Sequence, residues 1–315
     1  MTYKAKLGLL AAAAIILVAV FLFIDLGGSW DYAFPRRIKK VLAIILTGGA
    51  IALSTTVFQT VTNNRILTPS VMGLDSLYIL IQTTVIFVFG SFTLHELGSN
   101  VNFLINVGAM ILFAGVLYKI LFQREGNNIY FLLLIGMIFG TLFSSMSSFM
   151  EVLIDPNEFQ YVADKMFASF NNVKTELLVL SFIVVALTLL YFARFAKYLN
   201  VLSLGREQAI NLGVNYDYVV KRLLIIVAIL ISVATALVGP ITFLGLLVVN
   251  VAYEVMKTYR HSLLITASIL ISVIALVGGQ LVVERVFTFS TTLSVIINFI
   301  GGVYFIYLLL KESKA

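Results

Sequence analysis

The sequence predicts an all-α membrane protein that crosses the bilayer about ten times. Hydrophobic residues make up 61% of its 315 residues, charged residues only 11%, and the mean hydropathy is +1.05. A helix that spans the apolar core of a bilayer needs about 20 mostly apolar residues. Apolar runs of about this length occur at 7–26, 38–62, 73–90, 102–122, 129–149, 174–193, 219–238, 241–256, 262–281 and 293–310. They leave no room for a sizeable soluble domain, so residues 1–315 are expected to form one transmembrane domain.

The first run is expected to remain a helix, because its apolar stretch, 7–24, is longer than the core of a signal peptide. Residues 27–37 are predicted to form a short outer loop whose aromatic side chains lie at the membrane interface. The second run carries small residues at 47–50, which favour close packing between helices.

The backbone between the second and third runs is predicted to be interrupted. Gln59 and Asn64 end the second run, and Pro69 and Gly73 follow, so a continuous helix is disfavoured there. An interrupted backbone at membrane depth is tolerated only where it is buried in protein or lines a wet cavity. This segment is therefore expected to lie against other helices or beside a polar path.

Hydroxyl side chains end the fifth run, where Thr141, Ser144 and Ser145 are followed by Ser147 and Ser148. Such residues can line a polar path, and they can equally make ordinary hydrogen bonds between helices. The sequence alone favours neither interpretation.

Two further features are predicted at the outer ends of the runs. The segment 151–173 is the longest outer connection, and a short helix is expected there over 161–170. The eighth run begins with Gly239-Pro240, and proline fits the first turn of a helix. The seventh and eighth helices are therefore expected to meet in a tight turn, with the eighth beginning at Pro240.

A short polar segment, 203–213, separates the sixth and seventh runs. Ser203 is a candidate helix N-cap, and Gly213 can adopt the left-handed conformation that ends a helix. Leu204, Ile210 and Leu212 supply apolar surface, whereas the intervening residues are mostly polar. The pattern predicts a small amphipathic helix at the membrane surface that contacts a soluble partner.

The distribution of basic residues predicts the orientation. The chain ends and loops that share a side with the N-terminus hold twice as many Lys and Arg residues as the opposite side. The positive-inside rule therefore places both termini and the segment 203–213 in the cytoplasm. The net charge of +6 reports this orientation rather than nucleic-acid binding, and the absence of cysteine excludes disulfides and thiolate metal sites. A basic cluster at 36–40 lies outside, against the rule.

Four segments in order carry a resemblance to a known family. They are Gln59, Asn64, Pro69 and Gly73 at a fixed spacing; Leu204-Gly205 with Ala209 and Leu212-Gly213-Val214; Gly239-Pro240-Ile241 with Phe243 and Gly245-Leu246; and Gly301 with 304–309. With these segments the chain resembles the permease subunits of ATP-binding-cassette importers for iron–siderophore complexes and vitamin B12. Its departures, among them Val249, Asn250 and Leu281, resemble the branch that serves catecholate siderophores such as petrobactin.

The resemblance implies roles for particular residues. The cytoplasmic coupling segment of the family, which docks on the ATPase, corresponds to 203–215 and to Leu204, Gly205, Arg206, Glu207, Ala209, Leu212 and Gly213. The residues that would receive acidic groups of the extracytoplasmic binding protein are Arg36, Arg37, Lys40 and Arg285. Candidate path or gate residues are Gln59, Asn64, Pro69, Thr141, Ser144 and Ser145. Interfacial snorkelling is the alternative explanation for the basic cluster.

The resulting expectation is a type II importer permease in a bacterial plasma membrane that moves ferric siderophores. Its partners would be an ATPase subunit, a second permease that is identical or related, and a siderophore-binding protein. The chain has no phosphate-binding G-x4-G-K-[ST] motif, so ATP would be hydrolysed on the partner, and no catalytic residue, cofactor or resident metal is expected.

Three alternatives remain. The same mechanism could import haem or vitamin B12. An ion-coupled secondary transporter would need carboxylates within the membrane, for which Asp75 near a helix start is the main candidate. An intramembrane enzyme is disfavoured because both histidines, His95 and His261, are expected in loops.

Overall fold

The computed structural model describes residues 2–24, 30–96, 98–123, 129–289 and 291–312, all of them helical or irregular. Within these ranges, eight helices are long and apolar enough to cross a membrane: α1 (Tyr3–Phe23), α2 (Trp30–Thr62), α4 (Gly98–Gln123), α5 (Ile129–Leu153), α7 (Thr175–Ala193), α10 (Tyr216–Val238), α12 (His261–Arg285) and α13 (Leu293–Glu312). Two further apolar helices, α3 (Leu74–Glu96) and α11 (Leu244–Met256), have shorter apolar segments. Each of these ten helices overlaps one of the ten predicted runs.

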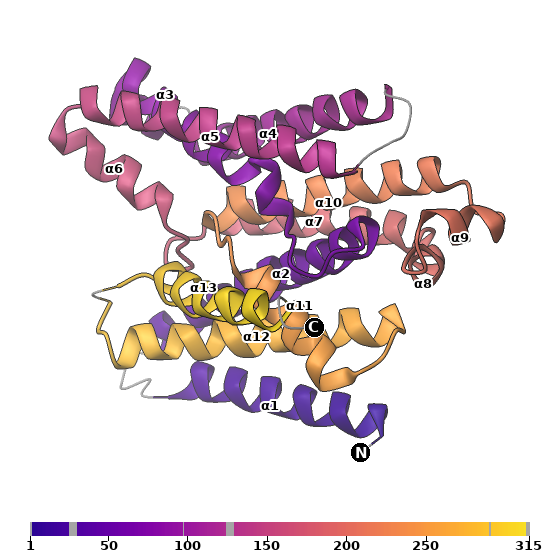
Figure 1. The fold of residues 1–315 in the computed structure, drawn as a ribbon. Coiled ribbons are helices and arrows are strands. Elements are labelled where there is room, and N and C mark those ends of the chain that lie inside the picture. The colour runs from indigo at the N-terminus through magenta and orange to yellow at the C-terminus, as the bar shows by residue number, and fades with distance from the viewer. Residues whose placement is uncertain (1, 25–29, 97, 124–128, 290, 313–315) are drawn as a thin grey trace.

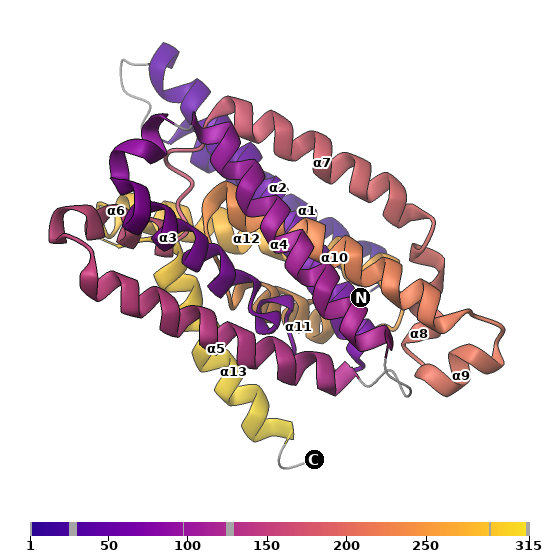
Figure 2. The ribbon, with the colours of Figure 1, turned by 90° about the horizontal axis from the view of Figure 1, so that it is seen from above.

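Helices α2 and α10 form the centre of the molecule and pack against each other (Figures 1 and 2). α2 also contacts α11 and α12, whereas α10 contacts α4 and α7. Of the apolar segment of α2, 83% is buried inside the chain, compared with 22% for α5 and 11% for α1. The peripheral helices therefore present much of their apolar surface to lipid or to a partner.

Small residues allow the central helices to approach closely, as predicted for 47–50. A Cβ atom on Gly48 would lie 2.4 Å from the hydroxyl oxygen of Ser272 in α12. A Cβ atom on Gly245 would lie 2.1 Å from the hydroxyl oxygen of Thr55 in α2. Side chains at these positions would separate the helices, so the glycines set the spacing of α2 to α11 and α12.

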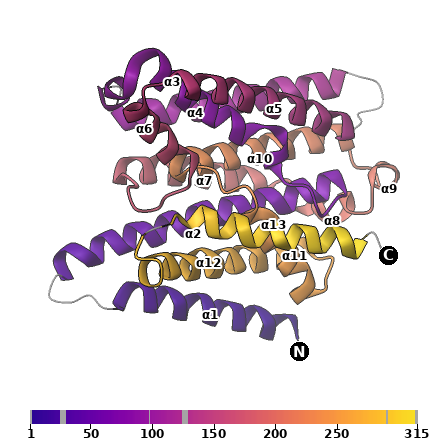
Figure 3. The ribbon, with the colours of Figure 1, turned by 60° about the vertical axis from the view of Figure 1, so that its left-hand side comes forward.

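Five short elements complete the structure: η1 (Pro69–Met72), α6 (Pro156–Met166), η2 (Ala196–Tyr198), α8 (Leu199–Leu202) and α9 (Arg206–Asn211). α6 lies at one end of the bundle (Figure 1), and α8 and α9 lie at the other. The start of α1 and the end of α13 share the end that carries α9 (Figure 3).

The predicted outer loop at 27–37 is wrong from Trp30 onward, because α2 already begins there. Residues 25–29 lie outside the described residues. Trp30 and Phe34 are four residues apart, and their rings stack on each other and on Phe23 at centroid distances of 5.9–6.2 Å. This aromatic cluster favours a helical start, because residues at i and i+4 lie on the same face.

The short outer helix is displaced from its predicted position at 161–170. α6 begins at Pro156, where the Asp155 carboxylate accepts a hydrogen bond from the backbone N–H of Asn157 at 2.8 Å. The helix ends at Met166, and the chain continues irregularly so that the N–H of Ser169 donates to the carbonyl of Val238 at 2.8 Å. A capping aspartate followed by proline is a stronger start signal than the apolar residues at 161–170.

The eighth membrane helix does not begin at Pro240. Gly239 has a φ of +99°, and α11 begins only at Leu244. A Cβ on Gly239 would lie 3.0 Å from the Cα of Ala168, so this turn packs directly against the irregular segment after α6. That contact and the positive φ keep 239–243 out of a helix.

The interrupted backbone between α2 and α3 packs against α5. Gly73 has a φ of +78°, and a Cβ there would lie 2.9 Å from the carbonyl oxygen of Gly136. A Cβ on Gly136 would in turn lie 2.8 Å from the Cα of Met72. The two backbones meet without intervening side chains, so this contact cannot adjust by a rotamer change.

Gly136→Ala should therefore destabilise the protein by about 1–3 kcal/mol, because the added methyl meets backbone atoms. The control is Gly108→Ala in α4, where no atom lies within 4 Å of the added Cβ. That change should be neutral or stabilising by about 0.5–1 kcal/mol, as alanine is the better helix former. Thermal denaturation of the detergent-purified variants measures both effects. Equal unfolding midpoints for Gly136→Ala and Gly108→Ala would contradict the close contact at Gly136.

Candidate functional site

The segment 203–213 forms an exposed helix, α9, on a compact base formed by α8. Gly205 is its N-cap with a φ of +99°, and Gly213 ends it with a φ of +81°, as predicted. Ser203 does not cap the helix: its hydroxyl donates to the carbonyl of Asn200 at 2.9 Å. The chain reverses at Gly205, where the positive φ suits glycine and not serine.

The predicted coupling residues lie together on this segment. Ala209 is fully buried and anchors α9, and Glu207 is exposed. Leu204, Ile210 and Leu212 are 56%, 49% and 63% exposed. Large apolar side chains this exposed beside polar ones are typical of an interaction surface.

Arg206 fixes α9 to the helix that follows it. Its guanidinium lies 3.7 Å from the Asp217 carboxylate and 5.8 Å from the ring of Tyr216, both in the first turn of α10. The ion pair is exposed and contributes little to stability. Its position nevertheless orients α9 relative to a central membrane helix.

The predicted gate residues form a closed hydrogen-bonded turn. Asn64 accepts the N–H of Ile66 at 2.9 Å, and its own N–H donates to the carbonyl of Gln59 at 3.1 Å. The carbonyl of Arg65 accepts from the side-chain amides of Gln59 at 2.6 Å and Asn250 at 3.0 Å. Polar side chains thus replace the helical hydrogen bonds that the interruption removes.

Pro69 begins η1 and is buried, so it shapes the turn and does not line an open path. In the sequence, Asn250 stands out only as a departure from the family pattern, whereas its side chain is 6% exposed and holds the turn. No sequence pattern indicates this contact, because Asn250 and the Arg65 carbonyl that it binds are 185 residues apart in the chain.

The hydroxyl residues of α5 divide between the two interpretations. Thr141 donates to the carbonyl of Met137 and Ser145 to that of Thr141, each at 2.9 Å, so both satisfy their own helix. Ser144 donates to Ser76 of α3 at 3.1 Å, which is a contact between helices. All three side chains are exposed on one face of α5 in the isolated chain, so they are also available to a path between two permeases.

A buried histidine joins the base of α9 to the gate, and sequence reasoning missed it. His261 is the first residue of α12, not a loop residue, and is 4% exposed. One ring nitrogen lies 2.8 Å from the hydroxyl of Thr60 in α2, and the other lies 2.8 Å from the amide oxygen of Asn200 in α8. The backbone N–H of His261 also donates to Asn200 at 3.0 Å.

A cavity of about 550 Å³ lies beside this histidine. It is lined from the gate by Gln59, Asn63 and Arg65, and from the base of α9 by Ser203 and Leu204. The predicted gate turn and the segment just before α9 therefore face the same space at the end of the bundle that carries the N-terminus (Figure 3).

The predicted docking cluster is at the opposite end, near the end of α1 and of α12. The Arg37 guanidinium caps α1 by donating to the carbonyls of Phe21 and Leu22, both at 3.2 Å. Lys40 forms an ion pair with Glu284 at 2.8 Å. Capping and pairing give these two side chains structural roles that the sequence did not indicate.

Arg36 and Arg285 complete the cluster and are exposed. The Arg36 guanidinium lies 4.0 Å from the centroid of the Tyr32 ring, and Arg285 donates to the carbonyl of Ile24 at 3.4 Å. The structure thus brings together all four predicted residues from the two ends of the sequence.

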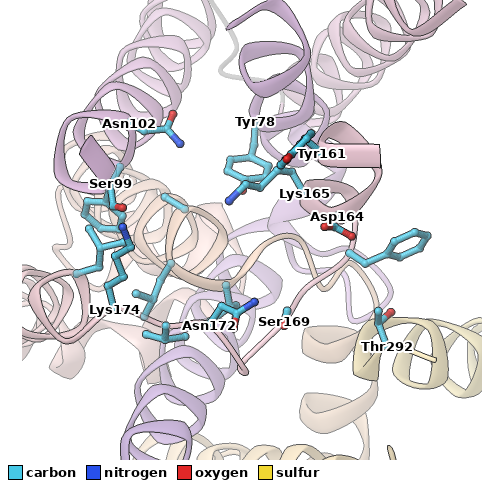
Figure 4. Close-up of a pocket in the computed structure, with 17 residues that line it drawn as sticks. Tyr78, Ser99, Asn102, Tyr161, Asp164, Lys165, Ser169, Asn172, Lys174 and Thr292 are labelled. Atoms are coloured by element: carbon cyan, nitrogen blue, oxygen red, sulfur yellow. The ribbon is translucent and has the colours of Figure 1, made fainter. Parts of the chain in front are cut away.

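A second cavity of about 540 Å³ opens at the same end, between α3, α4, α6 and the segment 167–174 (Figure 4). Lys165 and Tyr161 reach it from α6, Lys174 from the start of α7 and Asn102 from α4 (Figure 4). Burial lowers the pKa of Lys165, with Lys174 acting in the same direction and Asp164 opposing both. Sequence patterns do not indicate this cavity, because its residues come from five separate segments: Tyr78, 99–103, 161–177, 236–238 and Thr292.

The sequence and the fold are similar to those of known transport proteins. The FecCD transport family model matches residues 9–311. The petrobactin import system permease protein YclO of Bacillus subtilis is 67% identical over 315 residues, covering 100% of both chains. The petrobactin import system permease protein FatC of Bacillus anthracis is 36% identical over 279 residues, or 88% of this chain and 78% of its own.

A solved structure described as a metal-chelate type ABC transporter in an inward-facing conformation superposes with a TM-score of 0.83 at 22% identity, covering 98% of this chain and 100% of its own. That likeness confirms the predicted importer-permease fold. Because the family model spans nearly all of the sequence and the 67% identity extends from end to end, the chain belongs to the FecCD transport family.

Proposed function

We propose that this chain is the permease subunit of an ATP-driven importer that carries a ferric siderophore of the petrobactin class across a bacterial plasma membrane. The observation that carries the proposal is the exposed helix α9, whose base is connected to the proposed gate turn by a buried and a part-buried hydrogen bond through His261. The end-to-end identity with a petrobactin import permease supports the substrate class.

In this proposal the ATPase docks on α9. Leu204, Ile210 and Leu212 would enter an apolar groove of the ATPase, and Glu207 would lie at the polar rim. Because Ala209 is buried and anchors α9, the helix would move with the ends of the helices beneath it and not bend separately.

The displacement would then reach the gate through α8. Asn200 contacts the His261 side chain, which contacts Thr60, one residue after Gln59. Gln59 in turn holds the Arg65 carbonyl of the gate turn. The contact between His261 and Thr60 is buried, and breaking it would leave a polar group unsatisfied, so displacement of the whole unit costs less than separation at that point.

The exposed face of α5 would meet a second permease, identical or related, with the substrate passing between the two chains. Thr141, Ser144 and Ser145 lie on that face together with exposed apolar residues such as Phe149 and Val152. Hydroxyls offer a chelate weak, reversible hydrogen bonds, and the apolar residues would seal the two chains. Such a face suits passage better than tight binding.

At the opposite end, Arg36, Arg37, Lys40 and Arg285 would receive acidic residues of an extracytoplasmic binding protein. The end that carries α9, the start of α1 and the end of α13 would then be cytoplasmic, in agreement with the distribution of basic residues. Iron would arrive chelated as substrate, so the chain needs no metal site for it.

Leu212→Glu should abolish substrate-stimulated ATP hydrolysis and reduce uptake at least tenfold, because a carboxylate would enter the apolar ATPase contact. Leu212→Met keeps the apolar surface and should retain most of the activity. Both are measured in proteoliposomes that contain the full importer. Normal uptake by the Leu212→Glu variant would remove α9 from the ATPase interface.

Asn200→Leu should lower the ratio of substrate transported to ATP hydrolysed, because it breaks both side-chain bonds to His261. The control is Ser203→Ala, which removes only the local bond to the Asn200 carbonyl. Paired uptake and phosphate-release assays measure the ratio. If Asn200→Leu changed both rates in proportion, the link would be structural only.

Arg36→Glu should weaken association of the binding protein by about 1 kcal/mol or more at low salt and less at high salt, where charges are screened. Arg36 is suited to this change because Arg37 caps α1 and its replacement would disturb folding. Lys4→Glu makes the same charge change at the other end of the molecule and should have no effect. A loss that ignores ionic strength would point away from electrostatic docking.

A further inference from the structure

One carboxylate lies inside the bundle at the junction of the gate and the central helices. Asp75 is in the first turn of α3, two residues after the left-handed Gly73. It faces Ser70 of η1, Thr235 near the end of α10 and Thr242 in the segment before α11. None of the Lys or Arg side chains in the described ranges pairs with it. The helix dipole favours its charge by only about 0.3–1 kcal/mol, which does not balance burial of an unpaired charge.

Two of the distances around this carboxylate are long for hydrogen bonds. The Thr235 hydroxyl oxygen lies 3.3 Å from one carboxylate oxygen of Asp75, and that of Thr242 lies 3.5 Å from the other. An O–H···O⁻ bond is normally about 2.5–2.7 Å long. Oxygen ligands that share a hard cation at about 2.3–2.6 Å lie roughly 3.3–3.7 Å from each other when they meet at right angles. The spacing therefore fits oxygens arranged around an ion.

A second, independent observation points into the same space. Thr55 of α2 is 1% exposed, and its hydroxyl oxygen has no hydrogen-bond partner. It lines the same cavity of about 10 Å³ as Asp75, Thr235 and Thr242. That volume is close to the space that one water or a bare ion of similar size occupies. A buried hydroxyl left unsatisfied costs about 1–3 kcal/mol, and a cation in the cavity would remove that cost.

We propose that this cavity binds one dehydrated monovalent cation of the size of sodium, held by the Asp75 carboxylate and the hydroxyls of Thr55, Thr235 and Thr242. A single carboxylate balances one positive charge, which leaves the buried site neutral. Calcium takes 6–8 oxygens, often from several carboxylates, and magnesium keeps several waters, for which the cavity has no room. The all-oxygen ligand set also excludes metals that prefer nitrogen or sulfur.

The cation would hold three parts of the molecule together. Asp75 begins the helix after the gate, Thr55 belongs to the helix before it, and Thr235 and Thr242 flank the turn between α10 and α11. With the ion present these parts would form one unit. Without it the buried carboxylate would have no opposite charge beside it, which is unfavourable. The inference depends on the fold and not on the proposed substrate.

The test is sodium-dependent stability of the full-length chain in lipid nanodiscs. The thermal midpoint should rise with sodium chloride and saturate, whereas choline chloride at equal ionic strength should give no such rise. Isotopic sodium should bind at about one ion per chain. Asp75→Asn should abolish both effects, and Thr55→Val should weaken sodium affinity about tenfold.

Thr47→Val is the matched control, since Thr47 is also buried in α2 with an unpartnered hydroxyl but does not line the cavity. It should leave sodium affinity unchanged. The proposal would be overturned if the wild-type chain bound no sodium, if potassium bound equally well, or if Asp75→Asn kept the response. A midpoint that follows pH and ignores sodium would overturn it too, because it would identify a protonated carboxyl group.

Discussion

A backbone interrupted at membrane depth must find its hydrogen bonds within the protein, and the rest of this structure depends on how that is done. The carbonyl of Arg65 accepts bonds from two side-chain amides, one from Gln59 before the interruption and one from Asn250 in α11. Lipid offers no replacement for these donors. The turn is therefore stable only while α2 and α11 stay in contact, which the close approach of Gly245 to Thr55 allows.

The same requirement explains why the gate can respond to a distant surface. A gate held by side chains from neighbouring helices follows the movements of those helices. His261 adds a connection to α8, whose other end leads directly into α9. In the proposed mechanism, two-sided contacts of this kind would let a small displacement at α9 reach the turn, because packed interiors shift between arrangements and do not deform gradually.

Much of the fold could be predicted from the sequence, because long apolar runs have one stable solution in a bilayer. Glycine positions were also informative: Gly213 adopts the left-handed conformation that its placement indicated, and Gly73 lies where the backbone was predicted to be interrupted. Helix starts were predicted less well. α2 begins at Trp30 because of an aromatic cluster with α1, and α11 begins late because Gly239 packs on Ala168. Both depend on contacts between segments, as does the link through His261, and local patterns do not contain them.

The central claim is that α9 and the gate move as one unit. The chain contains no cysteine, so spin labels can be attached to cysteines introduced two at a time. Suitable positions are Ile210 on α9, Arg65 at the gate and Lys39 at the opposite end, all with exposed side chains. Pulsed electron resonance on the assembled importer, with and without ATP, would give the three distances. The account predicts that the distance from Ile210 to Arg65 stays constant while both distances to Lys39 change. A change between Ile210 and Lys39 with Arg65 fixed relative to Lys39 would contradict it.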